Sequence, residues 1–425
     1  MMRTASIGAL ILVIVAITLV AAPISVEVRM LEVVGEGAKY WPRWRGPSGQ
    51  GQVAAGPYTE KWAPATHVWK TAVPGRGNSS PIVWGDRIFL TTGYGNGERL
   101  SLLAFSRTDG KQLWETFIPQ NGVEYVHYKN GFASATPATD GELIYASFGR
   151  HGLFAFDFNG KLVWQHKFGI IDNYHGPAGS PVLYKDRIFI YQDANPAPNQ
   201  PAFVGAFDKK TGKPIWTTPR NESVGWGTAV VINTGERDEL IVSSQRRVAA
   251  YDPDTGKELW TVRGNTFEVI PTPVVAHGLV FASSGRAGPT IAIRPGGSGD
   301  VTSSHVAWSS PRGSPFVPSG IVVGELLYLI NDMQSILTVY EAVSGKLVYQ
   351  ERLGVAIREG FSASPVHVNG KLYFTNDEGQ TFVVEAGRSF KLQHINELGE
   401  QTLASPALVD GTWYWRTASS LHAIR

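Results

Sequence analysis

The chain has 425 residues, of which 17% are charged and 43% are hydrophobic, and its formal net charge is +2. This balance, with no run of lysine and arginine and no basic block among aromatic residues, excludes nucleic acid as an expected partner. The chain contains no cysteine, which excludes a disulfide framework, a thiolate metal site, a cysteine nucleophile and a lipidated N-terminal cysteine.

The first predicted element is an export segment at residues 1–26. Arg3 precedes an uncharged stretch from Thr4 to Val26 that is rich in Ile, Leu, Val and Ala. Such a start is typical of a signal peptide, and the stretch is close to the ~20 residues that span a bilayer. We therefore expect an extracytoplasmic protein, in the periplasm or cell envelope. Residues 4–26 would be either a cleaved signal or an anchor in the inner membrane.

The next segment, residues 27–65, is a predicted linker or N-terminal extension. It contains the sequence Trp41-Pro42-Arg43-Trp44-Arg45-Gly46-Pro47. We expect this extension to pack on the side of the domain that follows, which spans residues 66–425.

Residues 66–425 repeat one pattern eight times. Each unit begins at a small residue and usually a proline, continues with apolar alternating runs separated by tight turns, and mostly ends in an aromatic strand. The units begin at Pro81, Pro137, Pro181, Ala229, Pro273, Pro318, Pro365 and Pro406. A four-stranded unit repeated every ~40–50 residues is typical of a β-propeller blade. We therefore predict one all-β domain, an eight-bladed β-propeller of four-stranded antiparallel blades.

A turn with glycine and lysine precedes most of the aromatic strands. Examples are Thr211-Gly212-Lys213 before Trp216 and Thr255-Gly256-Lys257 before Trp260. Glycine supplies the positive φ that a tight hairpin with a bulge needs. We expect the recurring aromatic residues to pack between neighbouring blades rather than to bind a cofactor. They are Trp69, Trp114, Trp164, Trp216, Trp260, Trp308 and Tyr349.

The two ends of the repeat region complement each other. The last unit reaches Arg425 after three strands, whereas His67-Val68-Trp69-Lys70 is a fourth strand without a blade. Pairing this N-terminal strand with the C-terminal blade closes the ring and removes the exposed sheet edges of an open array.

The repeat resembles that of enzymes that use pyrroloquinoline quinone (PQQ). The resemblance is carried by Ala-Tyr-Asp-Pro-Asp-Thr-Gly-Lys-Glu-Leu-Trp, from Ala250 to Trp260, and by its copy from Ala206 to Trp216. It covers residues 66–425, and the repeat is also similar to that of the outer-membrane barrel-assembly lipoprotein of the BamB type. The resemblance implies an eight-bladed propeller. It is specific for fold and weak for function, because quinone enzymes and members that bind no quinone share the motif.

Two features of the quinone enzymes do not carry over to this chain. Those enzymes typically have an adjacent cysteine pair over the cofactor, and this chain has no cysteine. Their calcium ion lies on Glu, Asn and Asp ligands that have no assigned counterpart here, although Glu268, Asn331 and Asp332 would supply oxygen ligands. The sequence therefore assigns no cofactor and leaves PQQ and calcium open.

Candidate binding residues lie in the loops that enter each blade's innermost strand and in the loops between its second and third strands. In a propeller these loops share one face, which is the usual binding mouth. The candidates for a pocket there are Arg76, His175, Trp226, Glu268, Arg312 and Arg358. Arginine forks match carboxylates, and aromatic walls with a few polar groups are typical of pockets. The alternative is that these loops are polar because they are wet, with arginines paired to Glu268 or Glu359.

Three functions stay open from the sequence. The first is a non-catalytic binding or scaffold protein, exported or held at the membrane by its N-terminal segment, whose loop-rich face binds a cell-envelope protein or a small anionic ligand. The second is a PQQ-dependent alcohol or sugar dehydrogenase with calcium, in which an arginine of the mouth holds a quinone carboxylate. The third is an enzyme of another class, such as a polysaccharide lyase or hydrolase. The missing cysteine pair favours the first.

Overall fold

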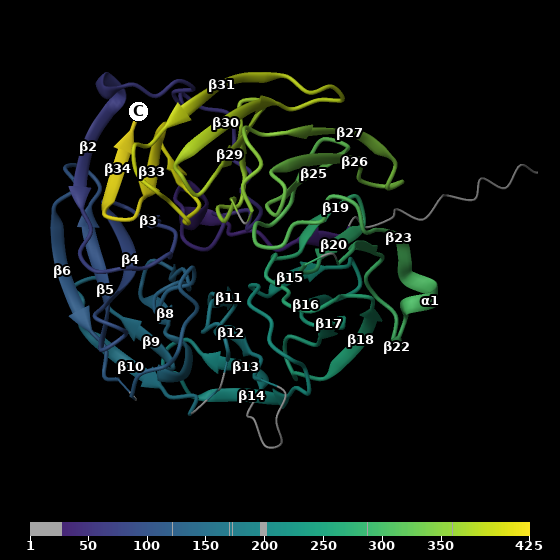
Figure 1. The fold of residues 1–425 in the computed structure, drawn as a ribbon. Helices are drawn as coiled ribbons and strands as arrows, with labels where there is room; N and C mark the ends of the chain where they lie inside the picture. The colour runs from purple at the N-terminus through teal and green to yellow at the C-terminus, as the bar shows by residue number, and fades with distance from the viewer. Residues whose placement is uncertain are drawn as a thin grey trace, which may run out of the picture.

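The structure is a computed structural model that describes residues 28–425 except 121, 170, 172, 196–201, 287 and 359. Eight sheets, each with a four-stranded antiparallel core, follow one another around a central axis (Figure 1). The predicted eight-bladed all-β propeller is therefore confirmed. The predicted export segment lies outside the described residues, and within them no helix is long and apolar enough to cross a membrane.

The strands of the first four blades follow chain order from the axis outward. They are β3 (Ile82–Trp84), β4 (Arg87–Tyr94), β5 (Arg99–Ser106) and β6 (Gln112–Phe117); β7 (Ala138–Thr139), β8 (Ile144–Ser147), β9 (Leu153–Phe156) and β10 (Leu162–His166); β11 (Val182–Tyr184), β12 (Arg187–Gln192), β13 (Phe203–Asp208) and β14 (Pro214–Pro219); and β15 (Val230–Asn233), β16 (Asp238–Ser243), β17 (Arg247–Tyr251) and β18 (Glu258–Arg263).

The last four blades repeat this order, and the eighth takes its outer strand from the N-terminal side of the chain. Their strands are β19 (Val274–Ala276), β20 (Leu279–Ser283), β21 (Thr290–Ile293) and β23 (Val306–Ser310); β24 (Ile321–Val323), β25 (Leu326–Asn331), β26 (Ile336–Glu341) and β27 (Leu347–Arg352); β28 (Val366–Val368), β29 (Lys371–Thr375), β30 (Gln380–Glu385) and β31 (Leu392–Glu397); and β32 (Ala407–Val409), β33 (Thr412–Arg416), β34 (Ser420–Ile424) and β2 (His67–Ala72).

The ring closes as the sequence predicted. Strand β2 pairs antiparallel with β34, with Trp69 opposite Ala423 and Lys70 opposite His422. The two strands lie side by side in Figure 1, although they come from opposite ends of the repeat region.

A ring of hydroxyl side chains, here called the hydroxyl ring, joins all eight blades near the axis. Each member donates its backbone N–H to the side-chain oxygen of the member in the next blade, across 2.9–3.2 Å. The members are Ser80, Thr136, Ser180, Thr228, Thr272, Ser319, Ser364 and Ser405. In the sixth blade the member is Ser319, so Gly320 and not the predicted Pro318 occupies the position that proline holds in most other units.

Tryptophan and glycine meet at the seams between blades, which confirms the predicted packing role of the repeated aromatic residues. Trp216 of one blade donates its indole N–H to the Pro253 carbonyl of the next across 3.1 Å. Gly256 has φ +73, and a Cβ atom there would lie 2.3 Å from the Trp216 ring. A side chain at Gly256 would therefore collide with the seam.

The fifth blade departs from this pattern. Strand β22 (Gly299–Asp300) adds to the outer edge of the fourth blade, and α1 (Thr302–His305) follows it. This insertion takes the place of the glycine-lysine turn. Trp260, which is fully buried, donates its indole N–H to Glu239 Oε2 across 2.8 Å instead of to a turn carbonyl.

The N-terminal extension packs against the propeller, on inner strands of three blades and, at Glu60 and Trp62, on the outer strand β31. Strand β1 (Arg29–Met30) pairs with β15, and 3-10 turns follow at Gly35–Lys39 and Pro64–Thr66. Trp41 bridges to Val83 of β3, and Gln52 bridges to His367 of β28. The extension thus reaches the innermost strands of the fourth, first and seventh blades, because these strands have an unpaired edge toward the axis (Figure 1).

Candidate functional site

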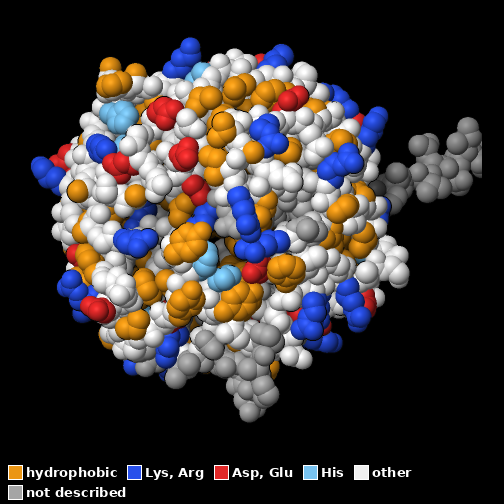
Figure 2. Space-filling view, in the orientation of Figure 1, with side chains coloured by type: hydrophobic (Ala, Val, Ile, Leu, Met, Phe, Trp, Pro, Cys, Tyr) orange, Lys and Arg blue, Asp and Glu red, His pale blue; other side chains and the backbone are white. Residues whose placement is uncertain are grey.

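Two connected cavities lie on the loop-rich face of the ring. The axial pocket has a volume of about 200 Å³, and the mouth cavity beside it has a volume of about 640 Å³. Their walls come from the loops that enter the innermost strands and from the loops between second and third strands, which is the arrangement the sequence predicted. Figure 2 shows basic, histidine and hydrophobic side chains gathered around the centre of this face.

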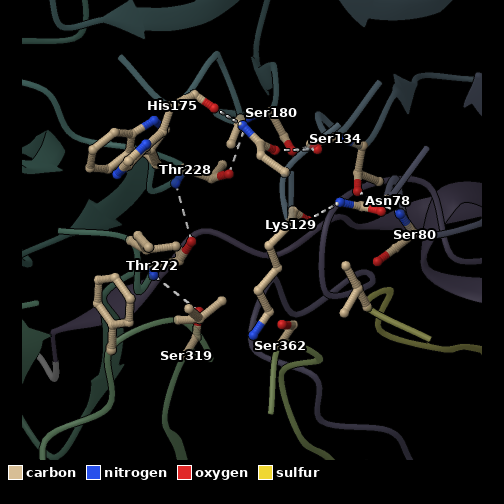
Figure 3. A pocket seen from close by; sticks show the side chains of 18 of the residues that line it. Asn78, Ser80, Lys129, Ser134, His175, Ser180, Thr228, Thr272, Ser319 and Ser362 are labelled. Atoms are coloured by element: carbon tan, nitrogen blue, oxygen red, sulfur yellow. Dashed lines mark hydrogen bonds between the residues drawn. The ribbon is translucent and has the colours of Figure 1, made fainter. Parts of the chain in front are cut away.

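The lower wall of the axial pocket is built from the hydroxyl ring and one tryptophan. Trp44, from the N-terminal extension, lines the pocket and donates its indole N–H to Thr272 Oγ1 across 3.2 Å. Six ring members also line it, namely Ser80, Thr136, Ser180, Thr228, Thr272 and Ser319. All of them except Thr136 are labelled in Figure 3. The extension therefore supplies part of the pocket wall through Trp44.

One side of the pocket is an aromatic wall around Trp226. The Trp226 ring stacks on the His175 ring at 5.4 Å between centroids, with 28° between the planes. Its indole N–H donates to the Gly176 carbonyl at 2.7 Å and lies 3.1 Å from Asn173 Oδ1. These bonds hold the Trp226 side chain, which is 6% exposed, in one orientation.

Glu268 contacts both His175 of this aromatic wall and the cationic side chain of Arg286. Its Oε1 lies 3.5 Å from His175 Nε2, and its Oε2 lies 3.1 Å from Arg286 Nε. The Arg286 guanidinium also lies over the Phe316 ring, 5.1 Å from the centroid. Glu268 has φ +60, a left-handed backbone conformation that residues other than glycine seldom adopt. Such conformations cluster in functional loops whose surroundings hold them in place.

A lysine and an aspartate face each other across the opposite side. Lys129 Nζ lies 2.9 Å from Asp377 Oδ2, and the Ser362 hydroxyl donates to the same oxygen across 3.1 Å. Both charged side chains are 18% exposed. Burial raises the pKa of Asp377, and the Lys129 ammonium opposes that shift. In Figure 3 the Lys129 side chain extends toward Ser362.

A second carboxylate lies behind the pocket wall. Asp332 is fully buried, and its Oδ1 accepts the backbone N–H of Phe316 at 2.8 Å and that of Val317 at 3.4 Å. Burial raises the pKa of Asp332 to about 7, although Lys129 and the backbone N–H donors oppose the shift. A carboxyl group with this pKa can hold or release a proton near neutral pH.

The mouth cavity adds a group of arginines. Arg76, Arg358 and Arg416 line it together with Lys129, and its acidic residues are Asp377 and Glu378. Arg416 is 2% exposed, and its guanidinium donates to the Ser79 hydroxyl and the Thr91 carbonyl, each at 2.7 Å. Burial lowers the pKa of Arg416 to about 9.

The structure brings most of the sequence candidates together and leaves one apart. His175 and Trp226 line the axial pocket, Glu268 contacts His175, and Arg76 and Arg358 line the mouth cavity. Arg312 is exposed and is absent from both linings as the structure describes them; its backbone carbonyl accepts the Tyr340 hydroxyl.

Sequence reasoning missed several residues of the site. These are Trp44, Lys129, Arg286, Arg416 and the ring hydroxyls as pocket groups. Lys129 directly follows His127-Tyr128 in the loop that leads to the second blade's innermost strand. Six of the hydroxyl residues are visible in the sequence as the serine or threonine before a unit's proline, whereas Thr228 precedes Ala229 and Ser319 precedes Gly320; no local pattern shows that they face one cavity.

The oxygen ligands that a calcium ion would need do not meet in this pocket. Glu268 is held by Arg286 and His175, and Asp332 accepts two backbone N–H groups. Among the residues with described positions, no three His, Asp or Glu side chains lie close enough together to hold a metal ion. The described residues therefore supply no cluster of three carboxylate or imidazole side chains for a calcium ion beside a quinone, although Asn331 Oδ1 and Asp332 Oδ2 are buried without a hydrogen-bond partner among them.

Comparisons with known proteins agree with this fold. A family model described as "Outer membrane protein assembly factor BamB" matches residues 61–195 and 202–425. The chain is 22% identical to the tetrathionate hydrolase of Acidithiobacillus ferrooxidans over 84% of this chain and 67% of that protein.

Two solved structures show the same architecture. BamB from Moraxella catarrhalis gives a TM-score of 0.59 at 13% identity, covering 84% of this chain and 98% of that one. The quinohemoprotein alcohol dehydrogenase from Comamonas testosteroni gives a TM-score of 0.63 at 13% identity, covering 91% of this chain and 80% of that one. At these identities the likeness extends to the fold alone.

Proposed function

The chain belongs to the family of the outer membrane protein assembly factor BamB, and from that premise we propose that it is a non-catalytic, extracytoplasmic binding protein whose axial pocket holds a small anionic ligand. The ligand enters through the mouth cavity on the loop-rich face. The predicted export segment at residues 1–26 and the family's outer-membrane name support the location.

The charge of the walls is the observation that carries this proposal. The described lining of the axial pocket includes two cationic side chains, Lys129 and Arg286, and no carboxylate, while the carboxylates that pair with them, Asp377 and Glu268, lie outside that lining. The described lining of the mouth cavity has four cationic side chains against Asp377 and Glu378. A concave surface with an excess of one charge raises the local concentration of ligands of the opposite charge.

The names of two matches support the proposal. One name supports an anion as the ligand of the pocket, and the other supports an envelope protein as a further partner. The name of the tetrathionate hydrolase states that it acts on tetrathionate, which is an anion of sulfur and oxygen. The name of the family states a role in assembling outer membrane proteins. The exposed Tyr125 and Tyr128 beside the mouth would suit contact with a larger partner while the pocket is filled.

Calorimetric titration of the full chain in mild detergent tests the proposal. Ethanedisulfonate, sulfate and tetrathionate are the anions, and ethylene glycol is the neutral control. We expect at least one anion to bind with one-to-one stoichiometry and ethylene glycol not to bind. Absence of binding by every anion would overturn the proposal.

Lys129 and Lys209 each form an ion pair with an aspartate, and together they give a matched test of the site. Lys129→Met should weaken anion binding about tenfold or more, because a hydrogen bond to a charged group is lost. Lys209 is the control, since its Nζ lies 2.8 Å from Asp140 and its side chain is 22% exposed, but it lies outside both cavities. Lys209→Met should bind as the wild type does.

Hydrolysis of an anionic substrate is the second candidate function. Two observations favour it: Asp332 and Asp377 have raised pKa values beside Lys129, and the relative from Acidithiobacillus ferrooxidans is named as a hydrolase. Incubation of the full chain with tetrathionate, followed by ion chromatography, tests it. Turnover that Asp377→Asn abolishes would support hydrolysis, whereas recovery of intact tetrathionate would exclude it for this substrate.

A further inference from the structure

The hydroxyl ring leaves eight protons without an acceptor in the described part of the protein. A serine or threonine hydroxyl has one proton to donate and two lone pairs to accept. Each ring oxygen accepts one backbone N–H from the neighbouring blade, and Thr272 accepts the Trp44 indole N–H as well. No carbonyl or carboxylate of the described residues accepts a proton from any of these eight hydroxyls.

Burial makes these protons chemically significant. The ring members are between 1% and 9% exposed, with Ser80 the most buried and Thr228 the least. Buried polar groups in proteins are satisfied by a protein atom, an ordered water or a ligand. Six of the eight members line the axial pocket, so their protons are available to whatever fills it.

Two cationic side chains add further donors to the pocket. Lys129 and Arg286 carry only donor hydrogens. The Asn130 side-chain amide donates to the His175 carbonyl, and its oxygen accepts the Ser134 hydroxyl at 2.5 Å, so this residue is satisfied within the wall. The pocket therefore offers hydroxyl donors from the ring and cationic donors from Lys129 and Arg286, which are paired with carboxylates outside its lining.

We propose that the hydroxyl ring is the recognition element of the axial pocket, and that it selects an oxyanion whose oxygens all accept hydrogen bonds, of the sulfonate type. This inference rests on the proposed function and specifies its ligand. A sulfonate group presents three acceptor oxygens and no donor, which matches hydroxyls that have protons to give. A polyol hydroxyl can accept these protons too, but it carries no negative charge to interact with Lys129 and Arg286.

The ring itself supplies a matched pair of variants for the test. Ser180 and Ser405 both precede a proline, both accept a backbone N–H at 2.9–3.0 Å, and both are nearly buried. Ser180 lines the axial pocket, whereas Ser405 is absent from its described lining. Ser180→Ala and Ser405→Ala thus each remove an equivalent hydrogen bond between blades. Only Ser180→Ala also removes a hydroxyl donor from the pocket.

Calorimetric titration of both variants with ethanedisulfonate decides the question, and thermal unfolding without ligand checks that both fold. We expect Ser180→Ala to weaken binding about tenfold and Ser405→Ala to change it less than about twofold, at similar unfolding temperatures. Ser180→Thr, which keeps the hydroxyl, should restore binding.

Each other outcome contradicts the inference. Equal weakening by the two alanine variants would show that the ring acts through structure alone. No weakening by either would show that water, rather than ligand, accepts the protons. If the wild-type protein binds no anion, both the proposed function and this inference fail. If the wild type binds ethanedisulfonate and the two alanine variants weaken binding equally, this inference fails and the proposed function stands.

Discussion

The backbone N–H of Ser405 donates to the side-chain oxygen of Ser80 across 3.0 Å, and this bond joins the last blade to the first. The same two blades are joined at their outer side, because β2 supplies the eighth blade's fourth strand and Trp69 then packs on the first blade's turn. The closure therefore has an inner and an outer part, and each can be tested by substitution.

Removing the outer closure contact should destabilise the ring. The Trp69 indole N–H donates to the Arg107 carbonyl across 3.1 Å, and its ring packs near Tyr414. We expect Trp69→Ala to lower the free energy of unfolding by about 3 kcal/mol in urea titrations. Val68→Ala, at a neighbouring position that is 54% exposed, should cost less than about 1 kcal/mol. Equal costs would contradict a closing role for Trp69.

The seam between blades should reject a side chain at its glycine. Gly256 and Gly370 have nearly equal φ, +73 and +74, but only Gly256 has a neighbouring ring where a Cβ atom would go. Gly370→Ala should cost about 1 kcal/mol from backbone conformation alone. Gly256→Ala should cost about 2 kcal/mol more, because the Trp216 ring must move. Chemical denaturation measures both, and similar values would rule out the seam contact as the cause.

Asp332 should make stability depend on pH. Its pKa in the folded protein is raised to about 7 by burial, above the value near 4 of an exposed aspartate. Because the pKa of Asp332 is higher in the folded than in the unfolded protein, its contribution to the free energy of unfolding is complete below the unfolded-state pKa. This contribution is lost as the pH rises through the folded-state pKa. We therefore expect the wild type to lose on the order of 2 kcal/mol of stability between pH 5 and pH 8 through this group.

The Asp332→Asn variant removes the titrating group and keeps an oxygen for the Phe316 and Val317 N–H donors. Its unfolding free energy should fall less between pH 5 and pH 8 than that of the wild type. Asp86→Asn, at a side chain that is 83% exposed, should follow the wild type. Parallel pH profiles for wild type and Asp332→Asn would show that Asp332 does not titrate in this range.

The mouth arginines should act mainly through long-range attraction. Arg76 and Arg312 are both exposed, and of the two only Arg76 is among the described lining of the mouth cavity. Arg76→Ala should weaken ethanedisulfonate binding about two- to threefold at low salt and less at high salt. Arg312→Ala should leave it unchanged. A larger effect from Arg312→Ala would place the ligand elsewhere on the surface.

The sequence was sufficient for the ring because the repeat is local and periodic. The turn before Trp216 and the orphan strand at Trp69 each carry their signal within a few residues, and eight repeats make it unambiguous. The grouping of His175, Trp226 and Glu268 followed from the rule that entry loops share one face.

The remainder of the site depends on contacts that have no local pattern. Trp44 reaches Thr272 across 228 positions of sequence, because the inner strand edges were open to the extension. Arg286 and Lys129 are single residues in irregular loops, so nothing periodic marks them. Arg312 satisfies the loop rule, yet its side chain is exposed away from both described cavities.

A crystal structure of the full chain grown with saturating ethanedisulfonate would test the central claim most directly. The account predicts one disulfonate in the axial pocket, with sulfonate oxygens within hydrogen-bond distance of Lys129 Nζ and of ring hydroxyls such as Ser180 Oγ. A pocket that contains only water at saturating ligand, or a disulfonate bound solely outside it, would contradict the account.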